Sequence, residues 1–86
     1  DDIKYFHDKL KSYLKFFDKL EAERQAVLIN LCFILGLQGL LSQTSLMILL
    51  ESFNYELAAD EIMKLNLSSM KDRLQELAQI MRLGHN

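Results

Sequence analysis

The stretch from Gln25 to Leu50 carries no charged residue, whereas the segments on both sides of it are rich in Lys, Asp, Glu and Arg. Its first part, from Ala26 to Leu35, is apolar on nearly every face of a helix. A helix that is apolar all round belongs in a protein core or in a lipid bilayer. The other segments are amphipathic, so the stretch predicts a central buried helix around which they pack.

This charge-free stretch is long enough to span a bilayer. Polar residues and glycines interrupt it, namely Asn30, Gly36, Gln38, Gly39, Ser42, Gln43, Thr44 and Ser45. Each polar group left unsatisfied in lipid would be costly. The flanking helices also need an apolar partner, and this segment is the one available to them. We therefore favour a protein core over membrane insertion.

Apolar residues before Glu21 recur every three or four positions, which predicts one stripe along an α-helix. They are Ile3, Phe6, Leu10, Tyr13, Phe17 and Leu20. Ser12 is a point at which this segment can break into two shorter helices. Lys and Asp are mixed on the other faces, which indicates a solvated surface rather than a membrane-binding one.

Glycines and polar clusters divide the rest of the chain into short helices. Glu21 to Leu35 is expected to be the central helix, which Gly36 ends. We expect a single turn or a very short helix over 37–42, and then a helix from Thr44 or Ser45 to about Glu51. Two more helices are expected over 55–65 and 69–82, and Gly84 ends the last. The side chains expected to face inward are Ile29, Phe33, Leu46, Leu49, Leu50, Leu57, Ala58, Ile62, Leu65, Leu74, Leu77, Ile80 and Met81.

No alternating strand pattern, repeat or linker occurs in the 86 residues. The sequence therefore predicts one all-α domain over residues 1–86. We expect a compact bundle of about five to six short helices around one buried central helix.

Charge and cysteine content exclude several functions. The net charge is -2, whereas a nucleic-acid-binding domain would usually carry a basic surplus. Cys32 is the single cysteine and has apolar neighbours, so we expect a buried side chain and no disulfide within the chain. His7 and His85 lie far apart in sequence, and neither a metal-spaced Cys/His cluster nor a Gly-rich phosphate loop occurs. We expect no metal and no cofactor.

The order of the motifs carries a family resemblance. Phe17-Asp-Lys-Leu-Glu-Ala22 leads to Arg24, Ala26-Val-Leu-Ile-Asn30, Phe33 and Gly36, and then to Gly39, Ser45-Leu46, Leu49, Tyr55, Ala58-Ala59, Arg73, Arg82 and Gly84. This order resembles the C-terminal lobe of the phage-type lysozymes of glycoside hydrolase family 24, the T-even phage endolysin type. The resemblance covers nearly the whole chain, and it implies the helical lobe of a peptidoglycan muramidase.

In that family a small N-terminal lobe carries the chemistry, with a Glu as general acid and an Asp or Cys nine residues later in a Gly-rich hairpin. By the resemblance, Asp1 falls inside the helix that would link the two lobes, so the acid-bearing lobe is missing. Glu51 and Asp60 have the same separation, but no Gly-rich hairpin lies between them. We interpret both as solvated helix carboxylates and expect no catalytic residue in this chain.

The resemblance places Ile34, Leu35, Gly36, Ser45 and Arg73 at the substrate cleft. Arg73 matches an arginine that faces the catalytic carboxylate across the cleft, and without that carboxylate we expect an ordinary surface ion pair. Ile34 and Leu35 are apolar where the family often has a polar side chain, and the chain has no Trp. Both departures weaken the case for sugar binding.

A second prediction concerns the leucines around Gly36 and Gly39. Leu35, Leu37, Leu40 and Leu41 lie in a turn that looks too short to bury all of them, and clustered exposed apolar residues usually mark an interface. The alternative is that they simply cap the core.

Two functions therefore remain open. The first is a structural and substrate-binding lobe that associates with peptidoglycan glycan and is not catalytic by itself. The second is a lysozyme-derived, non-enzymatic protein-interaction module that binds a protein partner or a second copy of itself. The chain opens on Asp1 and Asp2 and shows no signal peptide. The phage or prophage origin that the resemblance implies suggests the cytoplasmic or periplasmic side of a bacterial host.

Overall fold

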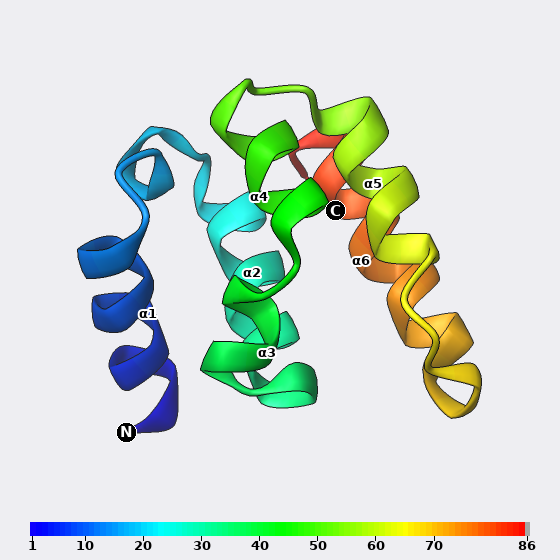
Figure 1. Ribbon diagram of the computed structural model, residues 1–86, viewed down its shortest axis with the longest axis horizontal. Helices are drawn as coiled ribbons and strands as arrows, with labels where there is room; N and C mark the ends of the chain where they lie inside the picture. Colours follow the sequence, from blue (N-terminus) through cyan, green and yellow to red (C-terminus); the bar gives the residue numbers. More distant parts are fainter. Residues whose placement is uncertain (86) are drawn as a thin grey trace.

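The computed structural model describes residues 1–85, and these form six α-helices, two short 3-10 helices and no strand. Figure 1 shows their arrangement. In chain order they are α1 (Asp2–Tyr13), η1 (Phe17–Lys19), α2 (Ala22–Leu35), α3 (Leu37–Leu41), α4 (Thr44–Glu51), α5 (Tyr55–Met63), η2 (Ser68–Met70) and α6 (Lys71–Leu83). The predicted all-α bundle is confirmed, and each expected helix is present.

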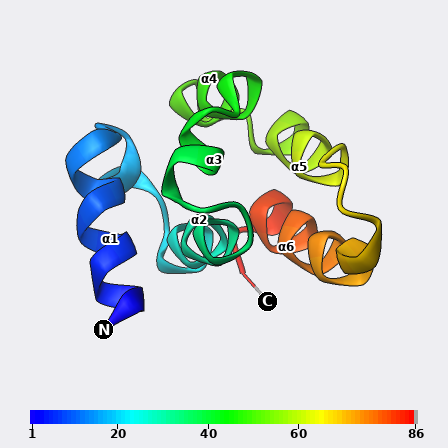
Figure 2. The ribbon, with the colours of Figure 1, turned by 60° about the horizontal axis from the view of Figure 1, so that its bottom comes forward.

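Helix α2 lies in the middle of the bundle. It contacts α1 on one side and α6 on the other, while α3 packs back against it after a tight corner. Helix α5 runs alongside α6 in the opposite direction and also contacts α4 (Figures 1 and 2). Helix α2 therefore positions α1, α3 and α6 directly, while α5 packs on α6 and α4 packs on α5.

The helices begin and end where their local sequence allows. Asp1 caps α1 by accepting a hydrogen bond from the Lys4 backbone N–H at 2.9 Å. Asn54 caps α5 in the same way. Gly36 and Gly84 end α2 and α6 with φ of +79° and +80°, a region that L side chains rarely adopt. Both glycines were predicted as helix ends.

The core draws on α1, η1 and every helix from α2 to α6. Its most deeply buried large side chains are Leu10, Phe17, Val27, Leu28, Leu31, Leu40, Leu46, Leu50, Ile62, Leu74, Leu77 and Met81. The inward positions expected in α4 and α6 are confirmed for Leu46, Leu50, Leu74, Leu77 and Met81, and Leu49 and Ile80 pack against the core partly buried.

Helix α2 is buried on one side only, which corrects the expectation for Phe33. That side chain is 52% exposed and packs edge-to-face on Phe6, with 5.0 Å between ring centroids. Ala26, Asn30 and Phe33 follow one another at helical spacing on the less buried side of α2. Ile29 is partly buried against the core.

Three other apolar positions differ from the prediction, namely Ile3, Tyr13 and Leu57. The first helix breaks after Tyr13, one residue beyond Ser12, and Leu14 is extended, so Tyr13 stays 56% exposed while Phe17 of η1 is fully buried. Ile3, in the first turn of α1, is 61% exposed. In α5, the small pair Ala58-Ala59 and Ile62 form the buried face, and Leu57 points away at 49% exposure.

Cys32 is 1% exposed, as expected for a buried thiol, and burial raises its pKa to about 11. In the part of the chain that the structure describes, none of the helices combines the length and the apolar character needed to cross a membrane.

Candidate functional site

The exposed side of the contact between α2 and α6 holds a shallow hollow of about 240 Å³. Val27, Leu77 and Ile80 supply its apolar surface, and Glu23 and Arg73 its charged groups. Val27 and Leu77 are core residues, so the hollow reaches down to the core between the two helices. A small group with an apolar part and a charged or polar part fits such a lining.

Asn30 holds Arg73 in this hollow. The Arg73 Nη2 donates a hydrogen bond to Asn30 Oδ1 at 2.6 Å, and Asn30 Nδ2 donates to the Ala26 carbonyl at 2.9 Å. The amide is thereby oriented by the backbone of α2, and it fixes one edge of the guanidinium. Within residues 1–85, Arg73 bonds to this neutral amide and forms no ion pair, whereas an ordinary surface ion pair was expected. A guanidinium has five N–H donors, so most of them stay available for an anion.

Of the five residues expected at a cleft, Arg73 is the one that lines this hollow. Ile34 and Leu35 are partly buried against the core at the end of α2, and Gly36 forms the exposed corner that follows. Ser45 is exposed in the first turn of α4. The five residues therefore come from three places in the fold, which are the end of α2 with the corner after it, the first turn of α4 and the first turn of α6.

The leucines expected at an interface have different environments. Leu40 is fully buried and belongs to the core, so it cannot itself contact a partner. Leu35, Leu37 and Leu41 are partly buried. Gly39 lies against Leu35, where an added Cβ would come within 3.1 Å of the Leu35 Cβ, so the corner between α2 and α3 packs closely.

Carboxylates and histidines are also dispersed. Glu51 is exposed at the end of α4, and Asp60 on α5 is ion-paired with Arg82 at 3.2 Å. His7 lies against Phe17 and beside Asp8, whose pKa is lowered by hydrogen bonds from Lys4 and His7. Among residues 1–85, no group of three or more His, Cys, Asp or Glu is placed to hold a metal ion.

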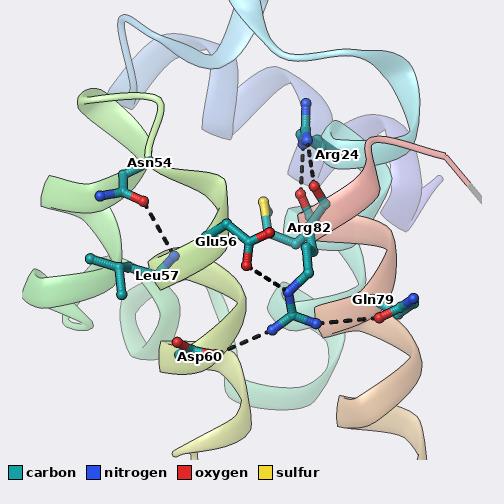
Figure 3. A network of polar contacts seen from close by, with 8 residues as sticks. Arg24, Asn54, Glu56, Leu57, Asp60, Gln79 and Arg82 are labelled. Atoms are coloured by element: carbon teal, nitrogen blue, oxygen red, sulfur yellow. Dashed lines mark hydrogen bonds and ion pairs between the residues drawn. The ribbon is translucent and has the colours of Figure 1, made fainter.

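The most elaborate polar network surrounds Arg24, a residue whose role the sequence reasoning missed. Its side chain is 8% exposed. Arg24 Nε donates to the Met81 carbonyl at 2.7 Å, and Nη2 donates to the Arg82 carbonyl at 3.1 Å (Figure 3). These carbonyls belong to the last turn of α6, where no intrahelical donor remains. Arg24 therefore caps α6 from α2.

Two further contacts complete the environment of Arg24. Its Cζ lies 3.5 Å from the centroid of the Tyr55 ring, a close cation–π contact. Nη1 donates to Glu21 at 2.8 Å, and this hydrogen bond lowers the pKa of the Glu21 carboxyl. Because Gly84 lies against the guanidinium, a Cβ at that position would come within 3.0 Å of the Arg24 Cζ and Nη1. A side chain at position 84 would therefore crowd the guanidinium, in addition to adopting an unfavourable positive φ.

A second arginine joins α5 to α6 on the surface. Arg82 donates to Glu56 at 3.1 Å, to Asp60 at 3.2 Å and to Gln79 at 3.3 Å (Figure 3). Arg82 is only partly exposed, and its two acidic partners, Glu56 and Asp60, lie one turn apart on α5. The donors and acceptors described for Arg82 and for Arg24 lie in or next to the helices that these two arginines join. We therefore interpret both networks as structural.

Comparisons with protein-family models, with curated proteins and with solved structures find no match for this chain.

Proposed function

We propose that this chain is a lysozyme-like helical lobe that associates with peptidoglycan glycan and is not catalytic by itself. The proposal rests on the resemblance of the motif order to the C-terminal lobe of phage-type lysozymes. The observation that carries it is the pair of Arg73 and Asn30 beside an apolar hollow. The resemblance would have this arginine face the acid-bearing lobe, and its unused donors suit a carboxylate there.

The hollow favours binding over catalysis. Glycoside hydrolysis requires two carboxyl groups on either side of the scissile bond. Glu23 is the one carboxylate among the residues that line the hollow, and it is exposed. An apolar surface beside an oriented guanidinium would suit the methyl and carboxylate groups that peptidoglycan carries. The catalytic acid of the muramidase would then come from another segment or another chain.

The alternative, a lysozyme-derived protein-interaction module, is favoured by a different observation. Large apolar side chains remain exposed outside the lining of the hollow, among them Ile48 and Leu57. Such residues support contact with a protein and contribute nothing to glycan binding at the hollow.

Co-sedimentation with insoluble peptidoglycan tests the proposal. The wild-type chain should sediment with the polymer, and Arg73→Gln should weaken binding, whereas Lys11→Gln should not. Both changes remove one exposed positive charge, so the comparison separates a specific site from general electrostatic attraction. Absence of binding, or equal losses in the two variants, would contradict glycan association and favour the interaction module.

A turbidity assay on the same polymer tests the statement about catalysis. We expect no lysis by the chain alone. Clear lysis that disappears in Glu51→Gln or Glu23→Gln would show that the chain contains its own acid and would overturn the proposal.

A further inference from the structure

A groove of about 430 Å³ lies on a different face, between the chain that leaves α1 and one side of α4. We refer to it as the α1–α4 groove. Figure 2 shows the end of α1 and the turn after it on one side and α4 on the other. Its apolar lining residues are Tyr13, Leu14, Phe16, Leu41, Met47 and Ile48. Leu41 is one of the leucines expected at an interface.

The apolar character of this groove follows from the composition of α4. Residues 46–50 of that helix are five consecutive apolar side chains, and a helix cannot direct five consecutive side chains to one side. Leu46 and Leu50 take the buried positions, and Ile48 stays 59% exposed at the groove. Tyr13, across the groove, is 56% exposed because the helix ends there. Two large apolar side chains thus flank an apolar depression.

The groove also carries one charge of each sign. Lys15 lines it from the α1 side and Glu51 from the end of α4. Both are exposed, and neither forms an ion pair with another residue in the described part of the chain. A surface that attracts an anionic membrane would instead be uniformly basic.

We propose that the α1–α4 groove is the interface between two copies of this chain related by a two-fold axis. In such an interface the same patch meets itself, so it must contain the complement of each of its own features. This patch satisfies that condition twice. The exposed Tyr13 and Ile48 of one copy can enter the groove of the other, and Lys15 can face the partner copy's Glu51 in both directions. The proposal does not depend on lysozyme-like function.

Sedimentation velocity from micromolar to sub-millimolar concentrations tests the apolar part. The wild-type chain should show a concentration-dependent dimer, and Ile48→Asp should abolish it. Ile3→Asp is the matched control, because Ile3 is also an isoleucine on a helix and is 61% exposed against 59% for Ile48. Circular dichroism verifies that both variants stay folded. A wild-type chain that is monomeric at every concentration, or equal loss of dimer in the two variants, would overturn the proposal.

A charge-swap experiment tests the two-fold geometry without changing an apolar residue. Lys15→Glu places two acids at the groove and Glu51→Lys places two lysines there. In a two-fold dimer of either variant both contacts bring like charges together, so self-association should weaken about tenfold or more. When the two variants are mixed, both contacts join opposite charges, and a heterodimer should form. A mixture that stays as monomeric as its components refutes the proposed pairing, even if Ile48→Asp fails to fold.

Discussion

Replacing Arg24 by methionine should destabilise the protein more than any other single change at a charged residue. Met keeps an aliphatic stem of similar length, so α2 retains its packing there, but it removes the whole guanidinium. The carbonyls of Met81 and Arg82 lose their donors, and Tyr55 loses its cation–π contact. Glu21 is mostly exposed, so its carboxylate can be hydrated when its partner is gone.

The size of the effect can be estimated from these contacts. Hydrogen bonds to a charged group contribute about 1.5–3 kcal/mol, and a desolvated cation–π contact contributes about 2 kcal/mol. The variant no longer desolvates a guanidinium, which offsets part of this loss, so we expect a net loss of about 3 kcal/mol. For a domain of this size about 1 kcal/mol corresponds to 4–8 °C in Tm, so the expected decrease is roughly 12–24 °C.

Thermal and urea unfolding followed by circular dichroism measure the loss, with Lys11→Met as a control that removes an exposed positive charge. Titration of Glu21 by NMR gives a second readout, because the pKa that Arg24 lowers should return toward its ordinary value. A Tm within a few degrees of wild type would refute the conclusion that this guanidinium holds the end of α6.

A double-mutant cycle with Gly84→Ala separates two causes of strain. In the wild-type background Ala must adopt φ near +80° and also displace the guanidinium, whereas in Arg24→Met only the first cost, about 1–2 kcal/mol, remains. The loss of stability caused by Gly84→Ala should therefore be smaller in the Arg24→Met background. Equal losses in both backgrounds would mean that the close approach to Arg24 has no energetic consequence.

Three further outcomes follow from the burial pattern. Phe17→Ala should cost about 3–5 kcal/mol because Phe17 is fully buried. Phe33→Ala should cost less, about 1 kcal/mol, because Phe33 is 52% exposed and meets Phe6 edge-to-face. Chemical denaturation that ranks the two variants the other way would contradict the fold. Leu40→Asp should unfold the protein, as judged by lost helicity, because Leu40 is fully buried and the carboxylate would have no partner. The free energy of unfolding should fall between pH 9 and about 11, by at most about 1.4 kcal/mol per pH unit, because the unfolded state releases the Cys32 proton in this window while the folded state retains it. Denaturation measured at a series of pH values should show that Cys32→Ala lacks this part of the decrease.

The helix ends could be predicted from sequence because they depend on local chemistry. Gly36 and Gly84 supply positive φ where a helix must stop, and that requirement can be read from one residue and its neighbours. The exposure of Phe33 could not be predicted in this way, because apolar residues surround it in sequence. Which side of α2 is covered depends on where α1 and α6 pack, and this is a long-range property.

The candidate site shows the same division. Only the family resemblance indicates Arg73, because its hydrogen bond to Asn30 joins residues 43 positions apart and no sequence spacing predicts that bond. Arg24, in contrast, has a local signal in the sequence. Together with Val27, Leu28 and Leu31 it forms a helical stripe at positions i, i+3, i+4 and i+7, so it lies on the buried face of α2. A buried arginine there requires acceptors, which α6 supplies.

The contact between Arg24 and the end of α6 also sets the order in which the protein can mature during synthesis. The chain leaves the ribosome N-terminus first, and the Met81 carbonyl follows Arg24 by 57 residues. Until α6 emerges, the guanidinium stays hydrated and the sides of α2 and α5 that α6 will cover remain open to water. These contacts can therefore form only late in synthesis, and a nascent or shortened chain that ends before Met81 would expose apolar surface to chaperones and proteases.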